Sequence, residues 1–100
     1  MNSILSSFNK AFEHRIRLGI MSLLMVNEAL DFNALKSALE LSHGNLASHL
    51  SALEKLGYIQ IEKRFVGKKP NTQYQASADG KSAFKSHIQQ LEQWLQSNTV

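Results

Sequence analysis

The chain has 100 residues, 43% of them hydrophobic and one of them proline, which fits a single helix-rich domain spanning residues 1–100. It contains no cysteine, so disulfides, thiolate metal sites and cysteine redox chemistry are excluded. The formal net charge of +3 is mildly basic and indicates, on its own, only a weak preference for polyanions. Because the longest apolar stretch, near residues 20–26, is too short to span a bilayer and no signal peptide is evident, we expect a cytoplasmic protein.

Two helices are predicted at the start of the chain. Apolar residues recur at intervals of three and four, which predicts an amphipathic helix over residues 3–13. A second helix is expected over residues 14–27, with Arg15 and Arg17 facing water. The residues expected to face the core from this second helix are Ile16, Ile20, Leu23, Leu24 and Met21.

The next segment is predicted to contain a very short strand followed by a helix. Residues 30–32 can form only a brief extended stretch, after which Asn33 is a good N-cap residue. The helix that follows would carry Leu35, Ala38 and Leu39 on its apolar side.

A further helix begins at Ser42, the expected N-cap, and stops at Gly57. Its inward face is a leucine repeat at helical spacing, Leu46, Leu50, Leu53 and Leu56. Its outward face is polar, small and almost uncharged, and comprises Gly44, Asn45, Ser48, His49 and Ala52. A solvated helix face usually carries Lys and Glu, so this composition favours close approach to another surface.

Two strands are predicted at residues 58–66 and 72–76, joined by a turn that contains Gly67 and Pro70. Four basic residues and one acid lie between residues 62 and 69, which accounts for the whole formal net charge. Ser77 or Asp79 can cap a final helix. Its apolar stripe has four-three-four spacing and consists of Phe84, Ile88, Leu91 and Leu95, with Trp94 alongside.

Five segments together resemble the small stand-alone winged-helix transcriptional regulators of the MarR/ArsR-like group. They are Arg17–Ile20, Leu30–Lys36, Gly44–Leu50, Leu53–Ile59 and Phe65–Pro70, and the similarity extends from about Phe12 to Leu95. The resemblance implies a mainly α-helical fold with a small β-hairpin (α+β), a winged helix-turn-helix in the order helix, helix, strand, helix, helix, strand, strand, helix. It also implies a homodimeric regulator, expected to be a repressor, that binds a pseudo-palindromic operator in double-stranded DNA.

In such proteins the second helix of the helix-turn-helix enters the major groove, and the wing reaches the backbone or the minor groove. The metal-sensing members use cysteine-containing or clustered His and Asp sites, which this chain lacks. The drug-sensing members are longer, with extra terminal helices around a ligand pocket. We therefore expect no metal and no cofactor, and the sequence does not identify an effector.

The residues expected to contact DNA come from the outward helix face and from the hairpin. Asn and Ser side chains can pair with base edges, and basic side chains can bind phosphates. The set is Ser42, Gly44, Asn45, Ser48, His49, Arg64, Lys68, Lys69, Pro70 and Asn71. The alternatives are a merely solvated helix face, lysines that only protect a strand edge, and a proline that only shapes a turn.

A dimer interface is expected on the two terminal helices, which carry more apolar side chains than one small domain would easily cover. The residues concerned are Phe8, Phe12, Phe84, Ile88, Leu91, Trp94 and Leu95. The alternative is that these side chains cap the core of a monomer.

No enzymatic site is expected. His43 and His49 are six residues apart, so they fall on different helix faces rather than at the spacing of a helical metal pair. His14 and His87 have no neighbouring acid in sequence, and no nucleophile-elbow or phosphate-loop motif is present. The remaining alternative function is a winged helix that binds protein or RNA without reading a DNA sequence.

Overall fold

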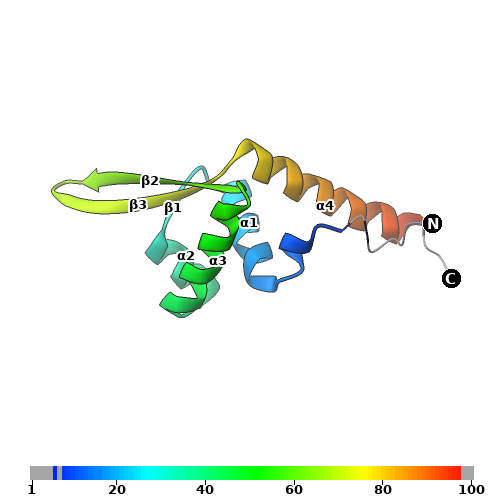
Figure 1. Ribbon diagram of the computed structural model, residues 1–100, viewed down its shortest axis with the longest axis horizontal. Helices are drawn as coiled ribbons and strands as arrows, with labels where there is room; N and C mark the ends of the chain where they lie inside the picture. Colours follow the sequence, from blue (N-terminus) through cyan, green and yellow to red (C-terminus); the bar gives the residue numbers. More distant parts are fainter. Residues whose placement is uncertain (1–5, 7, 98–100) are drawn as a thin grey trace.

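The computed structural model describes residue 6 and residues 8–97. The element order follows the prediction, and it builds a winged helix with a three-stranded antiparallel sheet in the order β1-β3-β2. Helices α1 to α3 form the body, while the β2–β3 hairpin and α4 extend from it in opposite directions (Figure 1). The elements are η2 (Lys10–Phe12), α1 (Arg15–Val26), β1 (Leu30–Asp31), α2 (Phe32–Leu39), α3 (His43–Lys55), β2 (Ile59–Val66), β3 (Lys69–Ala76) and α4 (Ala78–Ser97).

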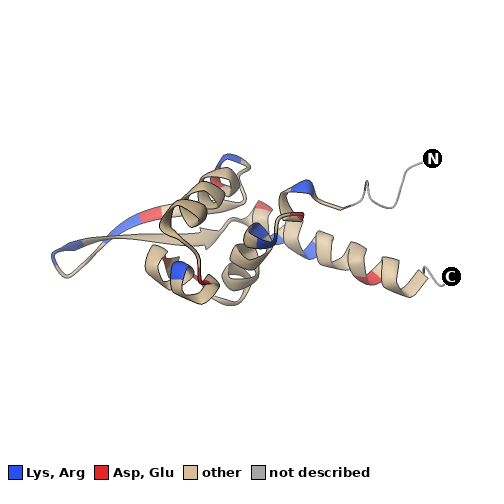
Figure 2. Cartoon of the chain, turned by 90° about the horizontal axis from the view of Figure 1, so that it is seen from below, with Lys and Arg blue, Asp and Glu red and all other residues tan. Residues whose placement is uncertain are grey.

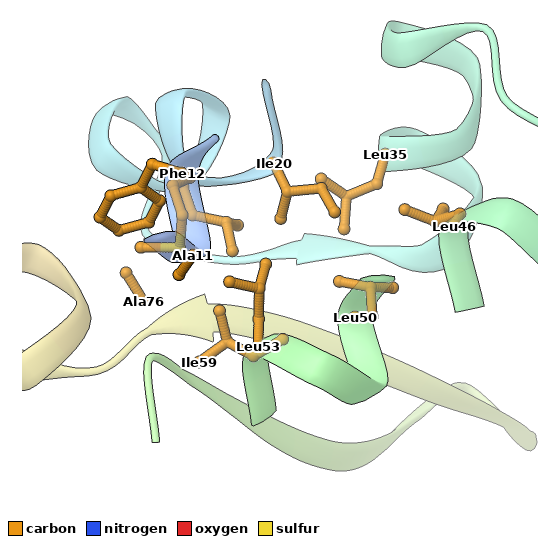
Figure 3. Close-up of a cluster of buried hydrophobic side chains, with 11 residues drawn as sticks. Ala11, Phe12, Ile20, Leu35, Leu46, Leu50, Leu53, Ile59 and Ala76 are labelled. Carbon is orange, nitrogen blue, oxygen red and sulfur yellow. The ribbon is translucent and has the colours of Figure 1, made fainter. Parts of the chain in front are cut away.

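The core lies between the three body helices and the base of the sheet (Figure 3). Ile20, Met21 and Leu24 enter it from α1, as the helical spacing predicts. Leu46, Leu50 and Leu53 of α3 supply the opposite wall, and Leu35 joins them from α2. This packing fixes α3 by its apolar stripe and leaves its polar stripe outward. The buried hydrophobic residues are Ala11, Phe12, Ile20, Met21, Leu24, Leu35, Leu46, Leu50, Leu53, Ile59 and Ala76.

The N-terminal segment corrects the predicted helix over residues 3–13. Among the described residues of that span, Ser6 and the three residues of η2 have 3₁₀-helical conformation, and residues 3–5 and 7 lie outside the description. Asn9 interrupts the helix because its side chain and backbone have other partners. Its Oδ1 accepts from the Ala11 N–H, its Nδ2 donates to the Tyr58 hydroxyl at 2.9 Å, and its backbone N–H donates to Nδ1 of His87 at 3.2 Å.

Side chains cap the N-termini of the three body helices. His14 caps α1 through its Nδ1, and Ser42 caps α3 as predicted, with its Oγ accepting from the Asn45 N–H at 3.2 Å. The predicted cap of α2, Asn33, is wrong. Asp31 takes that role, accepting from the Ala34 N–H at 2.7 Å, because the strand ends one residue earlier than expected and Phe32 is already helical.

The end of α3 explains a second difference. Gly57 has a φ of 78°, and Tyr58 N–H donates to the Leu53 carbonyl at 3.0 Å, which closes the helix in a Schellman-type turn. Leu56 was predicted to face the core, but it follows the last helical residue and its side chain is 51% exposed. Ala38 of α2 is likewise exposed, although its neighbours Leu35 and Leu39 pack as expected.

The hairpin is longer than the sequence indicated. Val66 pairs with Lys69 around a two-residue turn, in which Gly67 has a φ of 66°. Pro70 was predicted in this turn but is in β3, opposite Phe65. A proline is tolerated there because β1 pairs only with Gln73 and Tyr74, so β3 has a free edge near the tip. Apart from Ile59, every residue of β2 is exposed.

The base of the hairpin is joined tightly to the start of α4. Ser77 caps α4, since its Oγ accepts from the Gly80 N–H at 2.9 Å and donates to the Gly57 carbonyl at 2.6 Å. The Ser77 N–H also donates to the Tyr58 carbonyl at 3.0 Å. At Gly80 a Cβ atom would lie 2.0 Å from the Tyr58 carbonyl oxygen, so only glycine allows this approach.

Replacing Gly80 by alanine should therefore destabilise the fold by about 1–3 kcal/mol, because backbone must move to admit the methyl group. Gly44→Ala is the matched control, since its Cβ would meet nothing within 4 Å and alanine favours a helix by about 0.5–1 kcal/mol. Urea unfolding of both variants measures the difference. A Gly80→Ala protein as stable as the parent would contradict the close contact.

Candidate nucleic-acid interface

The outward face of α3 is presented much as the sequence predicts. Ser42, Gly44, Asn45 and Ser48 are all exposed on it. The Ser42 side chain is already used as the helix cap, so it positions the helix and has less freedom to contact a ligand. Around Gly44 the space is open, so a phosphate or a groove wall can come close to the first turn, where free N–H groups point outward.

His49 is placed differently from the rest of this face. It is half-buried, and its Nδ1 accepts a hydrogen bond from Nε of Arg17 at 3.1 Å. Its ring also lies against that of His14, with the centroids 4.2 Å apart. Burial lowers the pKa of His49, and electrostatic interactions with His14 and Arg17 lower it further. The neutral ring, protonated on Nε2, is therefore the favoured form.

Arg17 was predicted to face water, and this is wrong. It is half-buried because its Nε–H donates to Nδ1 of His49 on α3, so α1 brings a permanent cation beside that helix. His14, which caps α1, completes the same cluster. Neither residue was expected at the site. The only sequence signal was the presence of histidines on both segments, and periodicity cannot pair residues from different helices.

The wing carries the basic side chains at its outer part, where Figure 2 shows Lys and Arg along the strands and at the tip with one acid among them. Lys68 and Lys69 are exposed at the tip, so both can reach a polyanion. Arg64 instead forms an ion pair with Glu62, its Nη2 donating to Oε2 at 2.9 Å. This hydrogen bond lowers the pKa of Glu62 and raises that of Arg64. Both side chains are exposed, so the pair is weak and can exchange for a phosphate.

Asn71 connects the wing to the helix-turn-helix. Its Nδ2 donates to Oδ2 of Asp31 at 3.5 Å, and its Oδ1 accepts from Nε2 of Gln73. Asp31 is also the cap of α2, so one carboxylate contacts both the wing and the body. Asn71 is half-buried by these contacts, and its side chain is better placed to orient the wing than to reach DNA.

The residues expected at a dimer interface fall into two groups. Phe12 is buried within the protomer, where its ring stacks on Tyr58 and meets Phe84 and His87 edge-on. Phe8 also meets His87 edge-on. These aromatic rings cap the core of a single chain, which is the role that the monomer alternative gives them. Phe12 is buried and retains almost no surface for a partner.

The second group lies along the outer part of α4, the helix that projects away from the helical body (Figure 1). Ile88 and Leu91 are half-buried, whereas Trp94 and Leu95 are exposed. The radius of gyration is 15.4 Å, against about 13 Å for a compact chain of this length. The excess comes from the projecting elements, of which α4 carries the larger apolar stripe.

Within residues 6 and 8–97 no cluster of three or more His, Asp or Glu side chains is placed to hold a metal ion. Over the same residues, no helix is both long enough and apolar enough to cross a membrane.

Comparison with known proteins agrees with this geometry. The family model described as a winged helix DNA-binding domain matches residues 16–95. The chain is 34% identical over 84 residues to the uncharacterised protein MJ0432 of Methanocaldococcus jannaschii. This alignment covers 84% of this chain and 91% of MJ0432.

Among solved structures, the chain is similar to a transcriptional regulator homologue from Pyrococcus horikoshii OT3. The TM-score is 0.82 at 27% identity, covering 93% of this chain and 90% of the other. The reduced form of the transcriptional regulator YodB from Bacillus subtilis shares the fold, with a TM-score of 0.74 at 19% identity over 94% and 90% of the two chains.

The family match and the likeness to the regulator homologue from Pyrococcus horikoshii confirm the resemblance to winged-helix transcriptional regulators. The chain belongs to the winged helix DNA-binding domain family.

Proposed function

We propose that this protein is a homodimeric transcriptional regulator of the cytoplasm that occupies a pseudo-palindromic operator in double-stranded DNA and represses transcription there. One observation carries the proposal. A helix whose exposed face is small, polar and almost uncharged lies at the base of a projecting hairpin whose tip is basic. Such a pair of elements suits a base-reading helix and a backbone-gripping arm.

In this proposal α3 is the recognition helix. Asn45 and Ser48 can exchange hydrogen bonds with base edges in the major groove, because both are exposed and neither carries a charge that would favour phosphates alone. Neutral His49 can donate through Nε2, while its bond to Arg17 holds the ring in place. The fixed leucine stripe of α3 then sets the orientation of these polar groups.

The wing would supply affinity that does not depend on sequence. Lys68 and Lys69 can bind phosphates, and Arg64 can join them when its exposed pair with Glu62 opens. A purely protective role for charges at a strand edge would explain one or two lysines. It explains less well why the net charge of the chain gathers on this one arm.

The dimer in this proposal forms through α4. An isolated helical extension gains little from its own hydrogen bonds, and here it exposes Leu95 and carries half-buried Leu91 on the same stripe. A two-fold contact between such stripes would bury them. It would also hold two recognition helices about 34 Å apart, one turn of DNA, as a palindromic site requires.

The test of the whole proposal is selection of bound fragments from random duplex DNA. Enrichment of a sequence with two-fold symmetry, bound in a strongly salt-dependent manner, is the expected result. Equal binding of all duplexes, or capture of RNA or a protein in preference to DNA, would support the interaction-module alternative instead.

Replacing Asn45 by alanine should lower discrimination between the selected operator and random DNA by about 1–3 kcal/mol, with little change in non-specific affinity. The effect arises because a base edge would be left without its partner. Titration of both duplexes by fluorescence anisotropy measures it. Gln89→Ala, on the exposed face of α4, is the control and should leave discrimination unchanged. Parent-like discrimination in Asn45→Ala would argue against α3 as the reader.

Replacing both Lys68 and Lys69 by alanine should weaken binding to all sequences alike. The slope of log affinity against log salt should fall by about 0.9 for each phosphate that the wing no longer neutralises. The double variant of Lys81 and Lys85 removes the same charge from α4 and provides the matched control. If the two double variants lower the salt slope equally, the effect comes from net charge alone and the wing has no specific role.

Leu95→Lys should turn the dimer into a monomer and weaken operator binding, because a charge would be buried in the proposed contact. Leu95 is 71% exposed in the single chain, so the fold itself should be unaffected. Val26→Lys is the matched control, since Val26 is 80% exposed on α1. Sedimentation equilibrium at micromolar concentration distinguishes the two. A parent protein that is already monomeric would refute the dimer while leaving DNA binding intact.

A further inference from the structure

The tip of the wing is apolar as well as basic. Phe65 is 75% exposed and Val66 is 65% exposed, at the far end of β2. Phe65 pairs across the ribbon with Pro70, which is also exposed, so the two form one apolar pair on the same face. A hairpin with no binding partner would be expected to carry charged residues at these positions, because exposed aromatic side chains on a strand edge favour aggregation.

Basic side chains flank this apolar pair. Lys63 precedes Phe65 on the same face of β2, and Lys68 and Lys69 lie in and beside the turn. From residue 63 to residue 71 the sequence contains no acid. The surface therefore combines an apolar centre with a positive rim, which complements a narrow cleft between two rows of phosphates.

The arm has the length to reach such a cleft. Phe65 lies six residues beyond Ile59, the buried base of β2, which at about 3.3 Å per residue places it about 20 Å from the body. Half a turn of duplex, about 17 Å, separates the major groove from the next minor groove along the axis. With α3 in the major groove, the wing tip arrives at the neighbouring minor groove.

We propose that Phe65, backed by Pro70, acts as a wedge that enters the minor groove beside each half-site and partly unstacks one base step. This inference rests on the proposed function and adds a mode of recognition to it. Phenylalanine and proline are among the side chains that architectural DNA-binding proteins insert between base steps. The lysines on either side would hold the two phosphate backbones that border the groove.

A second copy of this chain is a poorer occupant for the same surface. Two wing tips that met would bring Lys63, Lys68 and Lys69 of one copy against the same residues of the other. Like charges placed opposite each other repel, whereas the phosphates of a duplex neutralise them.

The wedge predicts a feature of the operator at positions that α3 does not touch. Pyrimidine–purine steps unstack most easily, so they are favoured where Phe65 enters. Such a step should recur about 5 base pairs outward from the centre of each major-groove contact, which is about half of a 10–10.5 base-pair turn.

The experiment places 2-aminopurine at this step and at its two neighbours in the selected operator, and compares the parent with three variants. Phe65→Ala removes the ring, Phe65→Leu keeps an apolar wedge, and Val66→Ala removes a similarly exposed side chain from the opposite face. Operator affinity, its salt slope and the fluorescence of the reporter are measured for each. Thermal unfolding checks that each variant folds, as the exposure of both positions leads us to expect.

Binding of the parent should raise the fluorescence at one step only. Phe65→Ala should abolish the rise and weaken binding about tenfold with an unchanged salt slope, because every lysine that binds a phosphate is still present. Phe65→Leu and Val66→Ala should retain the rise.

Parent-like affinity and fluorescence in Phe65→Ala would overturn the wedge and leave the proposed function standing. Failure of the parent to prefer any duplex would overturn both, and loss of self-association in Phe65→Ala without DNA would assign the tip to a second copy.

Discussion

At the junction around Tyr58 the end of α3, the base of the hairpin, the start of α4 and the N-terminal segment all meet. The Tyr58 carbonyl accepts from the Ser77 N–H, and Gly80 lies so close to it that no side chain can be admitted. The Tyr58 ring stacks on Phe12, and its hydroxyl accepts from Asn9. The direction of the wing and the direction of α4 are both set here, because each begins within a few residues of these contacts.

This junction links the two projecting elements that the proposed function uses. The hairpin leaves it toward one end of the molecule and α4 toward the other, so the arm that we propose contacts DNA and the proposed dimer contact are well separated (Figure 1). The proposed recognition helix, α3, is held in place by its buried leucines and by the hydrogen bond from Arg17 to His49. A rigid link between these parts is what a dimer needs if it is to place two helices in register with one turn of DNA.

The polar contacts of the site position side chains more than they stabilise the fold. The pair between Glu62 and Arg64 is exposed and contributes little free energy. The bond from Asn71 to Asp31 is long, but it connects the wing to the cap of α2. Hydrophobic packing supplies the stability, and the exposed chemistry is left free for a partner.

The sequence by itself determined the elements whose signals are local. Three leucines of α3 (Leu46, Leu50 and Leu53), the Ser42 cap and the turn at Gly67 depend on nearby residues, so spacing and residue type were sufficient to predict them. The exposed polar face of α3 and the basic tip of the wing followed from the same patterns.

Only the tertiary structure decided the contacts between distant segments. Asn9 breaks the predicted first helix because it bonds to Tyr58 and His87, which are 49 and 78 residues away. Arg17 donates a hydrogen bond to His49, which is 32 residues away in the sequence. Asn71 donates one to Asp31, which is 40 residues away. Periodicity states which face of an element is apolar, but it contains no information on which distant polar group will lie within hydrogen-bonding distance once the core has packed.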